Sequence, residues 1–97
     1  MVKPPLKPID SKGRRILKGS RVRVIGIPDL STMPASSRRE TLPIFEHVRG
    51  TCRRVNAFES NGLVELIFSI RKGPHAGTHS IYIEPELLLL QEADVRA

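Results

Sequence analysis

The residues of this sequence with the clearest capacity for binding are arginines in two segments with strand-like patterns. They are Arg21, Arg23, Arg53 and Arg54. If the two segments pair as strands, the arginines on the outward face form a cationic patch that can bind phosphates or carboxylates. The alternative is an ordinary solvated face, since surface arginines also keep small domains soluble. Tyr82 is the one aromatic residue expected to add to this surface, which is little for stacking on nucleic-acid bases.

The residues that could act as a nucleophile or bind a metal ion lack a suitable arrangement. Cys52 begins a predicted strand, and we expect it to fill the core, where free cysteines are common. His75 and His79 are four residues apart, a spacing that suits a metal ion on a helix, but the glycines and proline of residues 73–77 exclude a helix there. We expect His79 to hydrogen-bond within a hairpin, and we expect no metal ion and no cofactor.

Three carboxylates, Glu65, Glu84 and Glu86, could act in catalysis only if a pocket surrounded them. We expect a small β-barrel, whose interior is just wide enough for its own side chains, so no substrate cavity is expected. The sequence also lacks the glycine-rich patterns that bind nucleotide phosphates. We therefore predict that the protein is not an enzyme.

Positive charge is concentrated in the first half of the chain. The formal net charge is +6, and residues 1–54 hold thirteen Lys and Arg against four Asp and Glu, whereas residues 55–97 hold three against six. This asymmetry favours a polyanionic partner such as RNA, or an acidic protein surface. Further cations are expected on loops, at Arg38, Arg39, Arg71 and Lys72.

Length and composition limit the class of protein. The chain has 97 residues, enough for one domain with a small core. Its single cysteine excludes an internal disulfide and suits a reducing cytoplasm. No segment approaches the roughly 18 apolar residues of a membrane span, and no apolar stretch of a signal peptide follows the first lysines. We expect a cytoplasmic protein that does not bind membranes.

The strongest structural pattern lies in residues 62–70. Val64, Leu66, Phe68 and Ile70 alternate with more polar residues, the pattern of a strand that is buried on one face. Turn-forming residues precede it at 59–62 and follow it at 72–77, so it should be the middle strand of an antiparallel meander.

Four further strands and one helix are predicted around this central strand. The first strand is predicted at residues 19–24, with Val22 and Val24 pointing inward and a bend near Gly26. The second is predicted at residues 51–58, with Val55 buried and a bulge near Arg53 and Arg54. The others are 78–84, with Ile81 and Ile83 inward, and 87–90. Because Pro43 suits only a first helical turn, a short helix is predicted from Pro43 to Arg49, with Leu42, Phe45 and Val48 on its buried face.

This layout, with a proline-containing turn before the last strand, is that of an SH3-like barrel. Residues 19–24, Gly-Ser-Arg-Val-Arg-Val, resemble the G-D-x-V-x-V opening of several SH3-like families. Residues 42–45, then 48–50 and Val55, look like the stretch that those families place before their second strand.

The resemblance is strongest to small stand-alone bacterial SH3-like barrel proteins of unknown function, through residues 79–86, His-Ser-Ile-Tyr-Ile-Glu-Pro-Glu. The sequence is also distantly similar to the nitrile hydratase β-subunit barrel and to KOW-like ribosomal barrels, although Arg53 stands where those families tend to have a second glycine. The resemblance implies a mainly β fold, a small SH3-like five-stranded barrel with one short helix in the long first loop.

These observations predict three segments and two candidate functions. Residues 1–17 are expected to form a flexible basic arm, 18–91 the barrel and 92–97 a frayed tail. We first expect a binding or accessory module for a protein partner, with a groove between residues 30–46 and the turn 59–61. The alternative is an RNA-binding module that uses the arm and the strand arginines. Weak self-association is a further expectation, because Ile25, Ile27, Leu63 and Ile67 fall on solvent faces.

Overall fold

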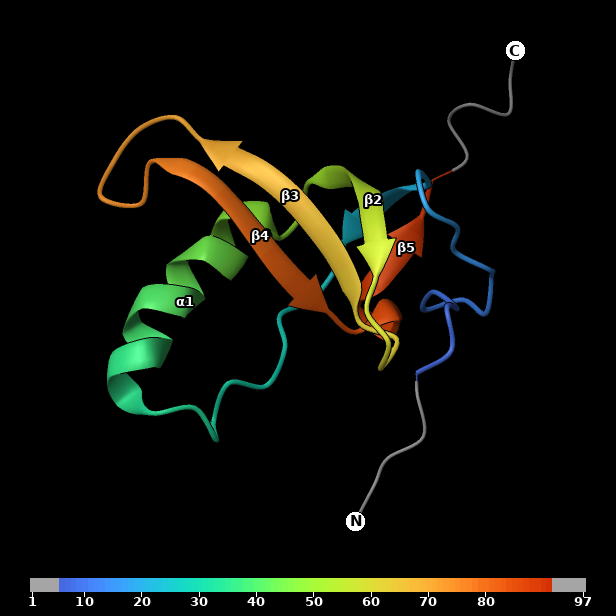
Figure 1. Ribbon diagram of the computed structural model, residues 1–97, viewed down its shortest axis with the longest axis horizontal. Helices are drawn as coiled ribbons and strands as arrows, with labels where there is room; N and C mark the ends of the chain where they lie inside the picture. The colour runs from blue at the N-terminus through green and yellow to red at the C-terminus, as the bar shows by residue number, and fades with distance from the viewer. Residues whose placement is uncertain (1–5, 92–97) are drawn as a thin grey trace.

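The computed structural model describes residues 6–91, and these form one antiparallel sheet with a single α-helix (Figure 1). The strands are β1 (Arg21–Val24), β2 (Cys52–Phe58), β3 (Val64–Ile70), β4 (Gly77–Ile83) and β5 (Leu88–Leu90). Their order across the sheet is β4-β3-β2-β1-β5, so β4 and β5 are its two edges. The mainly β fold is confirmed. No pairing joins β4 to β5 in the described chain, so closure into a barrel remains a prediction.

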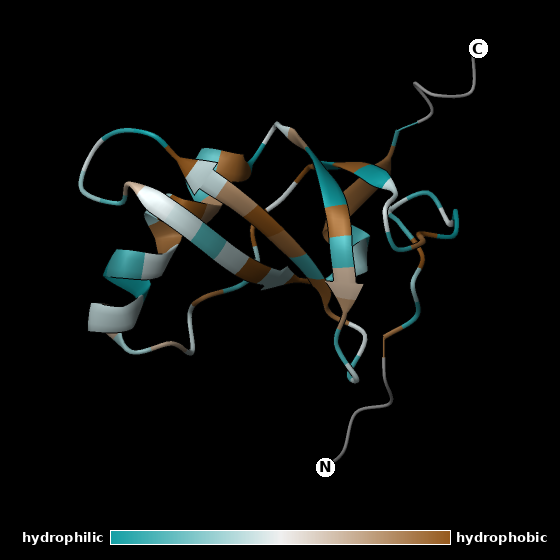
Figure 2. Cartoon of the chain, turned by 45° about the horizontal axis from the view of Figure 1, so that its top comes forward, coloured by the Kyte–Doolittle hydropathy of each residue, from teal (hydrophilic) through white to brown (hydrophobic). Residues whose placement is uncertain are grey.

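Strand β3 has the one-sided burial that its sequence predicted. Val64, Leu66 and Phe68 are buried and Ile70 is half-buried, while Ile67 and Ser69 point to solvent. The alternation arises because successive side chains of a strand point to opposite faces of the sheet. Figure 2 shows alternating hydrophobic and hydrophilic bands along β2, whereas most of β3 is hydrophobic.

One apolar core fills the inner face of the sheet. The predicted residues of β1, β2 and β4 all contribute to it, together with Leu88 of β5 and the buried residues of the helix. The members from the strands are Val22, Val24, Val55, Val64, Leu66, Phe68, Ile81, Ile83 and Leu88. A 3₁₀ turn at Pro85–Leu87 leads from β4 to β5, as the proline predicted.

The helix α1 (Ala35–Val48) is twice as long as the sequence indicated, and Pro43 lies in its interior. Phe45 and Val48 are buried as predicted, whereas Leu42 is exposed. A proline in a helix removes one backbone hydrogen bond, which is tolerated here because Pro43 faces solvent and Phe45 and Val48 anchor the helix to the core. Arg38 and Arg39, expected on a loop, therefore lie on α1.

The strand irregularities differ slightly from the predicted ones. The register between β2 and β3 shifts between Val55 and Ala57, one residue beyond the predicted bulge at Arg53 and Arg54. Strand β1 ends at Val24, and the next residue, Ile25, is exposed.

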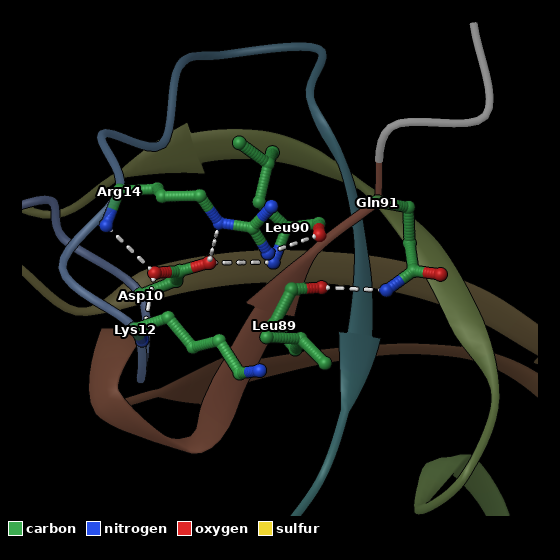
Figure 3. Close-up of polar contacts among 6 residues, drawn as sticks. All are labelled: Asp10, Lys12, Arg14, Leu89, Leu90 and Gln91. Atoms are coloured by element: carbon green, nitrogen blue, oxygen red, sulfur yellow. Dashed lines mark hydrogen bonds and ion pairs between the residues drawn. The ribbon is translucent and has the colours of Figure 1, made fainter.

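The segment before β1 is attached to the sheet by a buried aspartate (Figure 3). Asp10 is 4% exposed, and its carboxylate accepts hydrogen bonds from the backbone N–H groups of Lys12, Arg14 and Leu90 at 2.8–2.9 Å. The Arg14 guanidinium binds both this carboxylate and the Leu90 carbonyl. Ile16, 1% exposed, belongs to the core. We call Asp10, Arg14 and Leu90 the clasp.

The clasp differs from the flexible arm expected over residues 1–17. Of that arm, residues 6–17 make contacts that the sequence did not predict, namely the clasp, Ile16 in the core and the bond from Ser11 N–H to the Leu88 carbonyl. Residues 1–5 and the predicted tail at 92–97 lie outside the described residues.

Candidate binding surface

The four strand arginines divide between the two faces of the sheet. Arg21 lies directly opposite Arg54, and Arg23 lies opposite Cys52. These three arginines point away from the core, because Val22 and Val24 between them are buried. Arg53 instead lies opposite the buried Val22, and residues opposite each other in an antiparallel pair share a face. The predicted patch therefore contains Arg21, Arg23 and Arg54, and Arg53 is on the inner side.

We call the solvent-facing side of the sheet the outer face. Besides the three arginines it presents, from β2 to β4, Asn56, Glu65, Ile67, Ser69, Thr78, Ser80 and Tyr82. Two of its arginines are held by backbone carbonyls, since Arg54 donates to the Gly19 carbonyl at 3.1 Å and Arg23 to the Gly50 carbonyl at 3.0 Å. The outer face is thus cationic over β1 and β2 and uncharged over most of β3 and β4.

A shallow hollow of about 380 Å³ lies on the outer face between these two regions. Its lining includes Lys18, Arg54, Asn56 and Ile67. Ile67 is 46% exposed although it is the central residue of a strand in the middle of the meander. An aliphatic side chain beside two cations and an amide can accommodate an apolar group next to a carboxylate.

Glu65 forms a hydrogen-bonded cluster with three neighbours on the outer face. Its carboxylate accepts bonds from Asn56 Nδ2 and Ser80 Oγ, both at 2.8 Å, and from the Tyr82 hydroxyl at 3.2 Å. The bond from Asn56, followed by that from Ser80, lowers the pKa of Glu65. Glu65 is therefore held as a carboxylate, which suits it to fixing Tyr82 and does not suit it to acting as a general acid.

Tyr82 is exposed as predicted, at 43%, and projects from β4 on the same face as the arginines of β1 and β2. The cluster with Glu65 fixes the phenol against the sheet. Glu65 lies on the face of β3 opposite the buried Val64 and Leu66, as the alternation of this strand predicts, but the sequence did not indicate the cross-strand bonds. The register of β3 on β4, which sets Glu65 opposite Tyr82, is the information that was missing.

Arg53 belongs to a group of aromatic and cationic side chains at the inner side of β3. Its guanidinium carbon lies 5.2 Å from the centre of the Phe68 ring, a cation–π distance. The His47 ring of α1 stacks on the Phe68 ring with their centroids 6.1 Å apart, and the His79 ring is tilted relative to Phe68 with its centroid 5.9 Å away. His79 Nε2 hydrogen-bonds the His75 carbonyl at 2.6 Å, which confirms the predicted bond within the hairpin.

A second hollow, of about 470 Å³, lies where the end of β3 meets the C-terminal part of α1. It is lined by His47, Ser69, Ile70, Arg71 and Lys72. His47 links this hollow to Arg53 through Phe68. The sequence did not indicate a role for His47, because its contact with Phe68 depends on how α1 packs against the sheet.

The turn at residues 59–62 borders a third hollow, of about 350 Å³. Its other wall is the segment before β1, through Leu6, Pro8 and residues 15–18. The wall of this hollow opposite the turn is therefore not formed by residues 30–46, and the predicted groove between those residues and the turn remains a prediction. The segment expected to be a flexible arm forms that wall.

Cys52 is half-buried opposite Arg23 and is not part of the core that the sequence placed it in. Within residues 6–91 no three His, Cys, Asp or Glu side chains gather so as to hold a metal ion. The one α-helix of this part of the chain is too short and too polar to cross a membrane.

Comparison of the chain with models of known protein families, with curated protein sequences and with solved structures gave no match.

Proposed function

We propose that this protein is a non-enzymatic binding module whose outer face recognises a protein partner. The observation that supports this most directly is the hollow over Ile67, where Lys18 and Arg54 flank an exposed aliphatic side chain. Burying an isoleucine contributes to affinity, and the neighbouring cations select the charge of whatever covers it.

The chemistry of the hollow favours a partner segment with an aliphatic side chain next to an aspartate or glutamate. The aliphatic group would cover Ile67, and the carboxylate would bind Arg54 and Lys18. Arg21 and Arg23 extend the cationic surface beyond the hollow, and Tyr82 adds a fixed aromatic ring. An aromatic and an arginine on one surface are the residue types that contribute most to interfaces.

The architecture proposed for this module is an SH3-like barrel, as in the small bacterial proteins that the sequence resembles. Support comes from the strand order β4-β3-β2-β1-β5, the long connection with α1 between β1 and β2, and the 3₁₀ turn between β4 and β5. In this proposal the sheet curves so that its edge strands approach each other at the 3₁₀ turn.

The experiment is affinity capture of partners from a lysate of the source cells, with quantitative mass spectrometry. Wild type is compared with Ile67→Asp and Arg54→Glu on the outer face, and with Arg39→Glu on α1 as a control that makes the same charge change as Arg54→Glu. We expect at least one protein that wild type and the control retain and that both outer-face variants lose. Binding of that protein is then remeasured with purified components. Equal retention by all variants would disprove the proposal.

A second candidate function, RNA binding, is supported by the hollow lined by His47, Arg71 and Lys72, with Arg53 close by. If phosphates are neutralised there, affinity for total RNA should fall steeply between two salt concentrations. Arg71→Glu with Lys72→Glu should abolish the gel shift, and Arg39→Glu should not. The absence of any shift at low salt would exclude this candidate and leave the first untouched.

A further inference from the structure

The edge of the sheet formed by β4 is long, and no other part of residues 6–91 pairs with it. Strand β4 pairs with β3 through seven consecutive residue pairs, from Gly77 opposite Ile70 to Ile83 opposite Val64, with no register shift. It is the last strand of the sheet on its side (Figure 1). An edge strand of this length presents a row of backbone groups that can pair with another strand.

The backbone groups that face this open edge can be identified from the register. The Glu59 N–H donates to the Leu63 carbonyl at 2.8 Å, so Leu63 faces β2, and residues along a strand face alternate sides. Val64, Leu66, Phe68 and Ile70 therefore bond to β4, through Ile83, Ile81, His79 and Gly77. The residues between them, Thr78, Ser80 and Tyr82, direct their N–H and C=O groups outward.

All three residues are exposed. No backbone hydrogen bond outside the β3–β4 ladder reaches them from any other part of residues 6–91. Their edge therefore offers three donors and three acceptors, at a spacing of every second residue, to an incoming strand.

The opposite edge of the same sheet, formed by β5, is protected from pairing with another strand. Strand β5 is covered by the segment before β1, since Ser11 donates to the Leu88 carbonyl and the clasp occupies both backbone groups of Leu90. Strand β4 has no such cover from any part of residues 6–91. It also contains no proline, no bulge and no Lys, Arg, Asp or Glu, which are the usual devices against edge pairing.

We propose that the β4 edges of two copies of this chain pair antiparallel about a two-fold axis at Ser80. In this register Ser80 lies opposite its own counterpart, and Thr78 lies opposite Tyr82 of the second copy. Every pair so formed joins two residues whose backbone groups face outward, so all of them can bond. A two-fold axis makes the surface self-complementary, which is the commonest form of homo-oligomer.

The charges at the two ends of β4 favour a second copy over other occupants. The turn before the strand holds Arg71 and Lys72, and the residues after it include Glu84 and Glu86. Antiparallel pairing about Ser80 places Ala76 opposite Glu84, so the basic end of each strand lies beside the acidic end of the other. Parallel pairing would bring like charges together, which disfavours it.

Pairing at this edge is a property separate from partner binding by the hollow over Ile67, which lies one strand further into the sheet. It joins the two sheets into one and sets two outer faces side by side. A partner with two copies of the recognised segment would then bind with increased avidity.

The test is the molar mass of the full chain over a range of concentrations, by light scattering coupled to size exclusion. Ser80→Pro removes the outward N–H at the two-fold axis, and proline is tolerated on an edge strand where the N–H does not face the sheet. Ser80→Ala, which keeps the N–H, is the control. We expect wild type and Ser80→Ala to reach the dimer mass and Ser80→Pro to remain monomeric with an unchanged circular dichroism spectrum. Wild type that is monomeric up to about 1 mM would overturn the proposal.

Two charge-reversal variants test the proposal independently, in case Ser80→Pro does not fold. The variant with Glu84→Lys and Glu86→Lys and the variant with Arg71→Glu and Lys72→Glu should each be monomeric alone and should associate when mixed. If wild type is dimeric and both variants dimerise unmixed, the interface lies elsewhere. Amide hydrogen exchange tests the pairing at the residues themselves. The N–H groups of Thr78, Ser80 and Tyr82 should exchange more slowly as the protein concentration rises. Unchanged exchange rates in a dimer would also refute the pairing.

Discussion

Arg21 and Arg54 lie directly opposite each other across β1 and β2, with both side chains on the outer face. Like charges in this position destabilise an antiparallel pair, so the two arginines contribute nothing favourable to folding through their charges. Arg54 is held by the Gly19 carbonyl, which leaves its charge available at the hollow over Ile67. The pair is thus not explained by the stability of the fold, and in our proposal it serves to bind a negatively charged group.

Replacing one member of this pair should therefore stabilise the fold. Arg21→Glu converts a repulsive cross-strand pair into an attractive one, and we expect the free energy of unfolding to rise by about 0.2–1 kcal/mol. Urea denaturation of the variant and of Arg39→Glu, which makes the same charge change on α1, measures the effect. An equal gain in both would show that net charge and not the Arg21–Arg54 contact is responsible. The partner captured through the outer face should bind Arg21→Glu more weakly than wild type.

The clasp predicts a large effect of a nearly isosteric substitution. Asp10→Asn replaces an acceptor-only carboxylate with an amide whose nitrogen must face donors from Lys12, Arg14 or Leu90. We expect a loss of about 1.5–3 kcal/mol of stability, because buried hydrogen bonds to a charged group are lost and donors are left unpaired. Ser11→Ala, which keeps the backbone bond to Leu88, should lie close to wild type in the same denaturation series. Equal stability of Asp10→Asn and wild type would contradict this account of the clasp.

The same carboxylate makes the attachment of this segment dependent on pH. Burial acts to raise the pKa of Asp10, but the N–H groups of Leu90, Arg14 and Lys12 and the Arg14 charge outweigh it, so its pKa lies below the ordinary value of 3.8. A lowered folded-state pKa stabilises the fold above the unfolded-state value, and this contribution disappears as the pH falls through the folded-state pKa. The stability difference between wild type and Asp10→Asn should therefore be constant at neutral pH and shrink below pH 3.8. A difference that stays the same at acid pH would show that folding does not lower the pKa of Asp10.

The parts of the fold that the sequence predicted are those in which local alternation decides the structure. The spacing of two between Val64, Leu66 and Phe68 predicts that their side chains share one face of the strand. Pro85 predicts the turn that the structure shows as a 3₁₀ helix. The clasp could not be predicted in this way. It joins Asp10 to Leu90, eighty positions apart, and no pattern within either segment indicates the other.

The arginine site was predicted in part for a related reason. Residue types and alternation were enough to place Arg21 and Arg23 on one face, but they did not separate Arg53 from Arg54. The side on which Arg53 lies was fixed only by the pairing of β1 with β2, and its contact with Phe68 became visible only with the sheet assembled. In the same way Ile16 has no periodic neighbours, and it enters the core because the clasp holds its segment against β5.

Gly62 should be among the least replaceable residues at the surface. Its φ is +93°, and a Cβ there would lie 2.7 Å from the backbone nitrogen of Leu6. Gly73 has almost the same φ, +95°, with nothing near its Cβ position, so Gly73→Ala measures the backbone strain alone. We expect Gly62→Ala to cost at least about 1 kcal/mol more than Gly73→Ala, and to speed exchange of the Leu6 amide, which donates to the Asn61 carbonyl at 2.9 Å. Equal costs for the two substitutions would mean that the segment before β1 does not rest on this turn.

Pro43 offers a test of why α1 is longer than its sequence indicated. If packing of the buried Phe45 and Val48 stabilises the helix on both sides of Pro43, then the proline lowers the stability of the fold by an amount that this packing offsets. Pro43→Ala restores the backbone N–H of residue 43, which can then donate to the Arg39 carbonyl, and it removes the ring that crowds this carbonyl. It also raises the conformational entropy of the unfolded chain, which opposes part of the gain. We expect a gain of about 1–2 kcal/mol in stability by urea denaturation, less than the full difference in helix propensity between alanine and proline. A loss would indicate that the helix is bent at Pro43 in a way that the contacts of Phe45 and Val48 require. Leu42→Ala, at an exposed neighbouring position, should change stability by less than about 0.5 kcal/mol and serves as the control.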